Sequence, residues 1–208
     1  SGPDTPDATS SSEPVPDFSA ALTGDVRGVR VGVPRAFISE GVDDGVRKAY
    51  DAALETLRDA GATLVDIDLP HARHAIPVYY LVCTAEASSN LARYDGVKYG
   101  FRATIGRSDD LRTMYSRTRD QGFGTEVKRR IMLGTYVLSA GYYDAFYLKA
   151  QQVRTLVKRE YDQAFERADV VAMPTSPTPP FALGEKTDDP LQMYLADVFT
   201  VSANLAGL

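Results

Sequence analysis

Cysteine is almost absent from the sequence. Cys83 is the single cysteine among 208 residues, so the chain cannot form an internal disulfide. A chain without disulfides is typical of a reducing compartment, although some secreted proteins also have none, and we expect a cytoplasmic protein. Cys83 lies in the apolar run VYYLVCTAEA, which favours a small buried side chain over a reactive thiol.

Histidine is nearly as rare. His71 and His74 are the only two histidines, and a spacing of three residues could place both on one helix face as a metal-binding pair. No cysteine or carboxylate set lies near them at a ligand spacing, so we predict solvated loop histidines and no metal site. The scarcity of histidine also leaves no strong candidate for a general base.

Long apolar runs and an excess of positive charge are missing as well. No stretch approaches 18 consecutive apolar residues, so we expect no membrane span and no membrane partner. The formal net charge is −5 and the sequence pI is near 5.1, which argues against a protein that coats nucleic acid, because such proteins are usually basic. Docking to a partner that itself holds nucleic acid stays compatible with this charge.

The order of the patterns that are present indicates an α/β fold. Residues 1–27 contain several prolines and serines without a period, which predicts an extended segment. Residues 28–69 predict a strand, a helix and a strand, because the alternating valines of VRVGVP precede a helical pattern over 43–60. A helix of this length between two strands predicts that the strands are parallel. The helix should bury Val46, Ala49, Ala53, Leu54, Leu57 and Ala60.

The rest of the chain is mainly helical. Helices are predicted over 75–93, 109–119, 124–137 and 142–168, with a glycine-rich aromatic loop over 94–107 of the kind that often lines pockets. Residues 169–208 add a strand over 170–173, a proline-rich loop and a helix over 191–208. That strand is apolar on both faces, as in a central parallel strand. We therefore predict a mixed β-sheet flanked by helices, incomplete in this chain.

The helix predicted over 142–168 carries the most informative residue. Its core stripe is centred on Val153, and Arg154 lies about 100° away on a helical wheel, on the flank shared by Tyr143, Tyr147 and Tyr161. A guanidinium among tyrosines suits an anion receptor, and it equally suits a structural arginine that extends from the core edge to solvent. The stripe should bury Tyr142, Phe146, Ala150, Val157, Ala164 and Ala168.

No stretch of the chain supplies a recognisable nucleophile. Ser10, Ser11 and Ser12 lie in the N-terminal segment without the strained turn of a nucleophile elbow, so we predict ordinary loop serines. The sequence starts at Ser1 rather than Met and stops at Leu208 inside the apolar run VSANLAGL. We therefore expect an internal piece of a longer protein.

Six stretches together span nearly the whole chain. They are DATSSSEPVPDF (7–18), GVRVGVPRAF (28–37), NLARYDGVKYGFR (90–102), the block from GFGTEVKRRI to QQVRTL (122–156), PTSPTPPFALGEKTDDPLQMY (174–194) and ANLAGL (203–208). This combination resembles the amidase signature family. Two of its blocks, EVKRRI to QQVRTL and EKTDDPLQMY, resemble the glutamine-hydrolysing subunits of tRNA-dependent amidotransferases within it. The resemblance implies that residues 1–208 form a central-to-C-terminal part of a single amidase domain.

The resemblance implies a Ser–cis-Ser–Lys triad. In such a triad the lysine accepts a proton through the middle serine, and the terminal serine attacks an amide carbonyl. The acyl-enzyme is then hydrolysed after ammonia is released. The serine- and glycine-rich signature and the lysine are expected upstream of residue 1, so no catalytic residue falls within the chain. We expect the chain alone to be inactive as an amidase.

The resemblance also implies substrate contacts and partners. Arg154 is expected to bind the α-carboxylate of the donor glutamine, Tyr99 to line the glutamine pocket, and an acidic group beyond Leu208 to hold the α-amino group. The chain itself needs no cofactor. Ammonia would pass to amidotransferase subunits B and C, the first of which is kinase-like and uses ATP and magnesium to convert the misacylated tRNA. A general amidase for small amides and a binding module without the triad are the alternatives.

Overall fold

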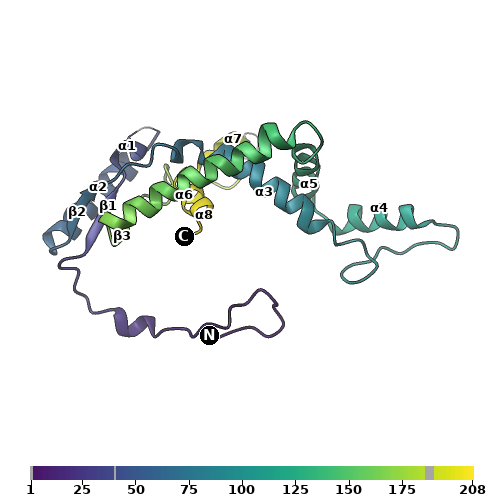
Figure 1. The fold of residues 1–208 in the computed structure, drawn as a ribbon, viewed down its shortest axis with the longest axis horizontal. Helices are drawn as coiled ribbons and strands as arrows, with labels where there is room; N and C mark the ends of the chain where they lie inside the picture. Colours follow the sequence, from purple (N-terminus) through teal and green to yellow (C-terminus); the bar gives the residue numbers. More distant parts are fainter. Residues whose placement is uncertain (1, 40, 186–189) are drawn as a thin grey trace.

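The computed structural model of the protein describes residues 2–39, 41–185 and 190–208. Figure 1 shows a small sheet at one end of the body, a layer of long helices that runs away from it, and a helix and loop that project at the opposite end. The first residues form an exposed, extended segment with one 3-10 turn, η1 (Phe18–Ala21), as their prolines predict.

Three short strands form the sheet: β1 (Arg30–Val33), β2 (Thr63–Asp66) and β3 (Val170–Val171). Their order is β2-β1-β3, and β1 pairs in parallel with both neighbours. The predicted α/β class is confirmed, whereas the described residues contain no antiparallel pair that would make the sheet mixed. The predicted central place of the 170–173 strand is wrong for the described sheet, because β3 lies at an edge and Val170 is 47% exposed.

α2 (Asp44–Asp59) connects β1 to β2, as the strand–helix–strand pattern predicts. The Asp43 carboxylate caps it by accepting hydrogen bonds from two backbone N–H groups of the first turn. Leu54 packs into the core with the valines of β1. The predicted core alanines Ala49, Ala53 and Ala60 are exposed, because the buried stripe of α2 is narrower than the sequence indicates. A short helix, α1 (Arg35–Ile38), lies between β1 and α2.

The longest helix is α6 (Lys149–Arg167), and a π-helical segment, η3 (Tyr143–Leu148), precedes it. Four predicted core residues are buried: Ala150, Val157, Ala164 and Ala168. Tyr142 and Phe146 are instead each 39% exposed, because the wider π-turns shift the residues before Lys149 away from the α-helical wheel. Tyr161, predicted for the flank, is buried, and its hydroxyl lies 2.8 Å from the Ser202 hydroxyl.

α3 (Ala75–Leu91) follows a 3-10 turn, η2 (Ala72–His74), and contacts α6, α8 (Val198–Ala206) and α5 (Thr125–Val137). The apolar cluster among α3, α6 and α8 consists of Ala75, Val78, Val82, Ala150, Val201 and Leu205. α3 and α5 approach most closely at Gly134, where an added Cβ would overlap the carbonyl oxygen of Thr84. This close approach requires glycine.

α4 (Leu111–Gly122) and the loop over 92–110 form the projection seen in Figure 1. Asp110 caps α4 by accepting a hydrogen bond from the Thr113 N–H at 2.7 Å. The loop is irregular, as its glycines predict, and several of its aromatic side chains are exposed.

The C-terminal residues form two helices, α7 (Pro190–Leu195) and α8, rather than the single helix predicted over 191–208. The chain turns between them at Asp197, and Gly207, with a φ of 82°, ends α8. Residues 186–189 of the EKTDDPLQMY block lie outside the described residues. Within the described part of the chain, no helix combines the length and the apolar character needed to cross a membrane.

Candidate functional site

Arg154 lies in the second turn of α6 and makes a structural contact with α8. Its Nε donates a hydrogen bond to the carbonyl oxygen of Leu205 at 2.9 Å. That carbonyl belongs to the last turn of α8, where carbonyl groups have no partner within the helix. A guanidinium at this position therefore satisfies a helix C-terminus and complements its partial negative charge. The structural interpretation of Arg154 is supported by this geometry.

The same arginine also lines a pocket of about 350 Å³. Among the described residues, no group accepts a hydrogen bond from either Nη of Arg154. The Leu205 contact therefore fixes the guanidinium plane through Nε and leaves the Nη pair available for a bidentate carboxylate. The receptor interpretation and the structural interpretation are compatible, because they use different nitrogens of one side chain.

α3 supplies the wall of the pocket that faces this arginine. Its contributing side chains follow a helical period of three and four, namely Tyr79, Val82, Cys83, Glu86, Ala87 and Asn90. α8 adds Asn204 beside Leu205. The pocket thus combines one guanidinium, one carboxylate and two amides with an apolar floor. This set complements a small zwitterion that also carries hydrogen-bonding groups.

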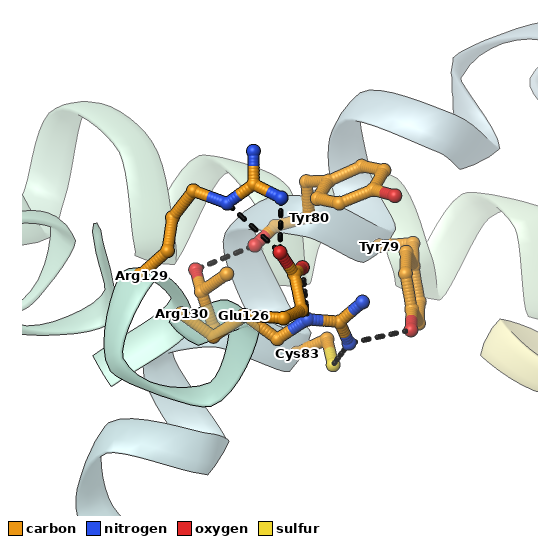
Figure 2. Close-up of polar contacts among 7 residues, drawn as sticks. Tyr79, Tyr80, Cys83, Glu126, Arg129 and Arg130 are labelled. Atoms are coloured by element: carbon orange, nitrogen blue, oxygen red, sulfur yellow. Dashed lines mark hydrogen bonds and ion pairs between the residues drawn. The ribbon is translucent and has the colours of Figure 1, made fainter. Parts of the chain in front are cut away.

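A second arginine contacts α3 side chains that line the pocket (Figure 2). Arg130 of α5 pairs through Nε with Glu126 at 2.9 Å. Its Nη1 donates to the Tyr79 hydroxyl oxygen at 3.5 Å and lies 3.9 Å from the Cys83 sulfur. Arg129 also pairs with Glu126, through Nε at 2.8 Å. Two side chains of the pocket wall are therefore held by one cation that is itself anchored to a carboxylate.

The charges of this cluster shift its protonation equilibria. Arg130, and then Arg129, lowers the pKa of the Glu126 carboxyl group through hydrogen bonds, and the Glu126 carboxylate raises the pKa of Arg130 in return. Contact with the Cys83 thiol and burial raise the pKa of the Tyr79 hydroxyl. Glu126 is therefore an anion, Arg130 a cation and Tyr79 a neutral phenol near pH 7.

Tyr99 is placed away from this pocket. Its ring is 49% exposed and packs edge-on against Tyr94, with ring centroids 5.5 Å apart. Tyr99 does not belong to the residues that line the Arg154 pocket. The structure therefore does not bring the two predicted substrate contacts together, and the role of Tyr99 stays a prediction.

The tyrosines predicted to support Arg154 have other partners. The Tyr147 hydroxyl accepts a hydrogen bond from Gln151 at 2.9 Å, and the Tyr161 hydroxyl pairs with Ser202. The tyrosine that lines the pocket is Tyr79, which the sequence patterns did not single out. The helical spacing of Tyr79, Cys83 and Glu86 was the available signal, but it did not show that this face meets α6.

Cys83 and His71 differ from their predictions. Cys83 is half-buried on the pocket wall rather than enclosed in the core. His71 lies in a turn with 40% of its side chain exposed, but it has a partner that the prediction missed. Its Nδ1 contacts the Glu160 carboxylate, and both Glu160 oxygens lie 3.1 Å from the His71 backbone nitrogen. His74 is exposed, as predicted. In the described part of the chain, no three histidine, cysteine or carboxylate side chains gather as a metal site.

The serines of the N-terminal segment serve its turns. The Ser10 hydroxyl accepts a hydrogen bond from the Asp4 N–H at 2.9 Å, and the Ser11 hydroxyl accepts one from the Glu13 N–H at 3.2 Å. These local contacts agree with the prediction of ordinary loop serines.

Comparison with known proteins assigns the class of the chain. The family model described as Amidase matches residues 1–208, so the chain belongs to the amidase family. It is 58% identical over 206 residues to the A subunit of glutamyl-tRNA(Gln) amidotransferase from Pelobacter propionicus. It is 56% identical over 207 residues to the protein of the same name from Chloroflexus aggregans. These matches cover 99% and 100% of the chain and 42% of each relative.

Solved structures support the same assignment. The crystal structure of the glutamyl-tRNA(Gln) amidotransferase A subunit from Thermotoga maritima matches with a TM-score of 0.69 and 36% sequence identity. The match covers 100% of this chain and 39% of that chain. A bacterial aryl acylamidase of the amidase signature family matches with a TM-score of 0.63 over 99% of this chain and 40% of its own, but at 18% identity it supports the fold alone. The chain therefore spans about 42% of the length of the curated relatives cited above.

Proposed function

We propose that the chain is part of the glutamine-hydrolysing subunit of a tRNA-dependent amidotransferase. The observation that carries this proposal is the Arg154 pocket, whose guanidinium complements the carboxylate of a free amino acid. The names of the relatives at 56–58% identity supply the reaction, since they are amidotransferase subunits. Glutamine is an amino acid that carries the amide such a reaction needs as a nitrogen source.

In this function, Arg154 holds the α-carboxylate of glutamine. Its Nη pair would form two parallel hydrogen bonds to the carboxylate oxygens, while Nε stays on the Leu205 carbonyl. Because Nε is already engaged, the guanidinium loses little further freedom on binding. The side-chain amide of the glutamine would then extend toward the Ser–cis-Ser–Lys triad, which we place outside residues 1–208. In this proposal the chain binds the substrate, and the groups that cleave it lie outside residues 1–208.

The released ammonia would serve partner subunits. We propose that a kinase-like partner, with ATP and magnesium, converts Glu-tRNA(Gln) to Gln-tRNA(Gln), and that a third chain completes a heterotrimer in the cytoplasm. The acidic group for the α-amino end of glutamine is proposed to come from beyond Leu208. Tyr99 remains a proposed pocket residue. An unchanged KM for glutamine in the Tyr99→Phe variant would show that this assignment is wrong.

The test uses the full-length protein together with its partner subunits. Glutamine hydrolysis and glutamine-dependent formation of Gln-tRNA(Gln) are measured with and without the partners. The proposal predicts glutaminase activity that responds to the partners and the tRNA. Hydrolysis of simple aromatic amides with no response to the partners would identify a general amidase instead. Binding of glutamine without any hydrolysis would identify a module that has lost the triad.

A further inference from the structure

Two side chains of the α3 part of the pocket lining are contacted by an arginine of α5. Tyr79 and Cys83 lie one turn apart on α3 and both line the pocket, and Arg130, which is not among the lining residues, contacts both. Figure 2 shows this arrangement, with Glu126 anchoring the guanidinium and Arg130 directed toward Tyr79 and Cys83. This contact adds to the packing of Tyr79 against the apolar cluster and against the Tyr80 ring, and it fixes the position of the hydroxyl end.

Hydrogen-bond chemistry decides what the Tyr79 hydroxyl can offer. A guanidinium has only donors, so the 3.5 Å contact uses the Tyr79 oxygen as an acceptor and leaves the hydroxyl proton unused by Arg130. The phenol is neutral near pH 7, because the ordinary pKa of tyrosine is about 10 and that of Tyr79 is raised. The hydroxyl is therefore a donor that points away from Arg130. Its partner in the structure is Cys83, and an oxygen of a bound ligand, a stronger acceptor than sulfur, would replace the thiol.

The size of the pocket limits where an occupant can lie. A volume of about 350 Å³ corresponds to roughly 9 Å across if the pocket is treated as a sphere, about the length of one extended amino acid. A glutamine whose carboxylate rests on Arg154 therefore also meets the α3 wall. At that wall, an oxygen of the ligand would compete with the Cys83 sulfur for the Tyr79 hydroxyl proton.

We propose that Tyr79 is a specificity-determining residue of this pocket, whose hydroxyl donates a hydrogen bond to an oxygen of the bound amino acid, and that Arg130 is its positioning residue. This inference rests on the proposed function, because it takes glutamine as the occupant. The Tyr79 hydroxyl would be a second hydrogen-bond donor besides Arg154, and the two together would favour ligands that carry an oxygen acceptor at each end. The pocket would reject amino acids of similar size that lack such an acceptor.

The first experiment measures kinetics of the full-length enzyme with its partners. Tyr79→Phe removes only the hydroxyl and should raise the KM for glutamine by about 3- to 10-fold, with kcat changed less than about twofold, as expected for the loss of one hydrogen bond. Ammonia-dependent amidation should be unchanged. Arg130→Gln should raise the same KM, because Tyr79 would lose its orientation. The matched control is Tyr80→Phe, which alters the adjacent tyrosine of α3 outside the pocket lining.

The second experiment needs no variant and so does not depend on folding of a mutant. Cys83 shares the pocket wall with Tyr79, so bound glutamine should slow alkylation of Cys83 by iodoacetamide, measured by mass spectrometry of the peptide that contains it. Protection at glutamine concentrations near KM is the expected result. Unchanged alkylation at saturating glutamine would overturn the inference.

The experiments distinguish failure of the proposed glutamine pocket from failure of the proposed role of Tyr79. If Arg154→Ala raises the KM for glutamine but Tyr79→Phe does not and Cys83 is not protected, glutamine binding stands and the role of Tyr79 is wrong. If Arg154→Ala leaves glutamine use unchanged, the proposed function of the pocket itself fails. A KM effect in Tyr80→Phe as large as that in Tyr79→Phe would indicate a general disturbance of α3 and would overturn the assignment.

Discussion

Replacement of Arg154 by alanine separates the two contacts that this side chain makes. The variant loses the Nε hydrogen bond to the Leu205 carbonyl, which is seen in the structure, and the Nη pair, which we propose for glutamine. The first loss affects folding stability, and the second affects substrate use. The two effects have different sizes and are measured by different assays.

The expected magnitudes follow from the kind of each contact. A hydrogen bond from a charged donor contributes about 1.5–3 kcal/mol, and the lower end applies here because Arg154 is only partly buried. Loss of a bidentate carboxylate contact should cost about 2–4 kcal/mol in kcat/KM for glutamine, or roughly 30- to 1,000-fold. Arg154→Lys keeps the charge but loses the planar fork, so it should recover only a small part of this loss.

The assay compares two nitrogen donors in the full-length enzyme with its partners. Amidation of the tRNA is measured with glutamine and then with ammonium chloride, which bypasses the pocket. Arg154→Ala should lose the glutamine reaction and keep the ammonia reaction nearly intact. Arg159→Ala is the matched control, because Arg159 is an exposed arginine of the same helix with no hydrogen bond to other described residues.

Two results would refute this reasoning. Equal loss of both reactions would indicate that Arg154 is purely structural and that α8 is displaced. If the variant uses glutamine as well as the wild type does, glutamine binds at a site other than the Arg154 pocket. Thermal unfolding of the variant distinguishes the first result from a binding defect, since a loss of a few kcal/mol in substrate use needs no comparable loss of stability.

Three further predictions concern the stability of the full-length protein. Gly134→Ala should destabilise it by about 1–3 kcal/mol or more, measured by urea unfolding, because the new Cβ overlaps the Thr84 carbonyl; an unchanged midpoint would contradict the close helix contact. Asp43→Ala should cost about 0.5–2 kcal/mol through loss of the α2 cap, and a neutral effect in the same assay would exclude that role. The hydrogen bonds from Arg130 lower the pKa of Glu126, so the stability that this carboxylate contributes is present above its unfolded pKa and is lost as pH falls through the lowered folded value. Glu126→Gln should accordingly be less stable than wild type at pH 7 and equal to it in strong acid, and a pH-independent difference would refute the pairing.

Local patterns predicted most of the helices and strands, because their causes lie within a few residues. The helical period located α2, α3 and α5, and the alternating valines located β1. The helical wheel predicted burial wrongly for residues before Lys149, because a π-turn depends on packing that no local sequence pattern reveals. The edge position of β3 was also inaccessible, because strand order is set by pairing between distant segments.

The site could be predicted only in part. Arg154 was selected from its flank position and from the family resemblance, and the structure places it on a pocket lining with one hydrogen bond, to Leu205. Its role toward substrate stays a prediction. Tyr79 was missed because its importance arises from α3 meeting α6 and α5 at once. The structural contact of His71 with Glu160 was missed for the same reason, since 89 residues separate the two in sequence.

The glycine at position 134 has a consequence for the pocket as well as for packing. Gly134 lies one helical turn after Arg130 on α5, so the residue that sets the spacing of α3 and α5 also sets how far the Arg130 side chain must reach. Arg130 Nη1 lies 3.5 Å from the Tyr79 oxygen, at the long end of hydrogen-bond distances, so a small increase in helix spacing would break this contact. A larger residue at position 134 would push α5 away from α3, so we expect it to lengthen the contact between Arg130 and Tyr79 as well as to destabilise the helix pair.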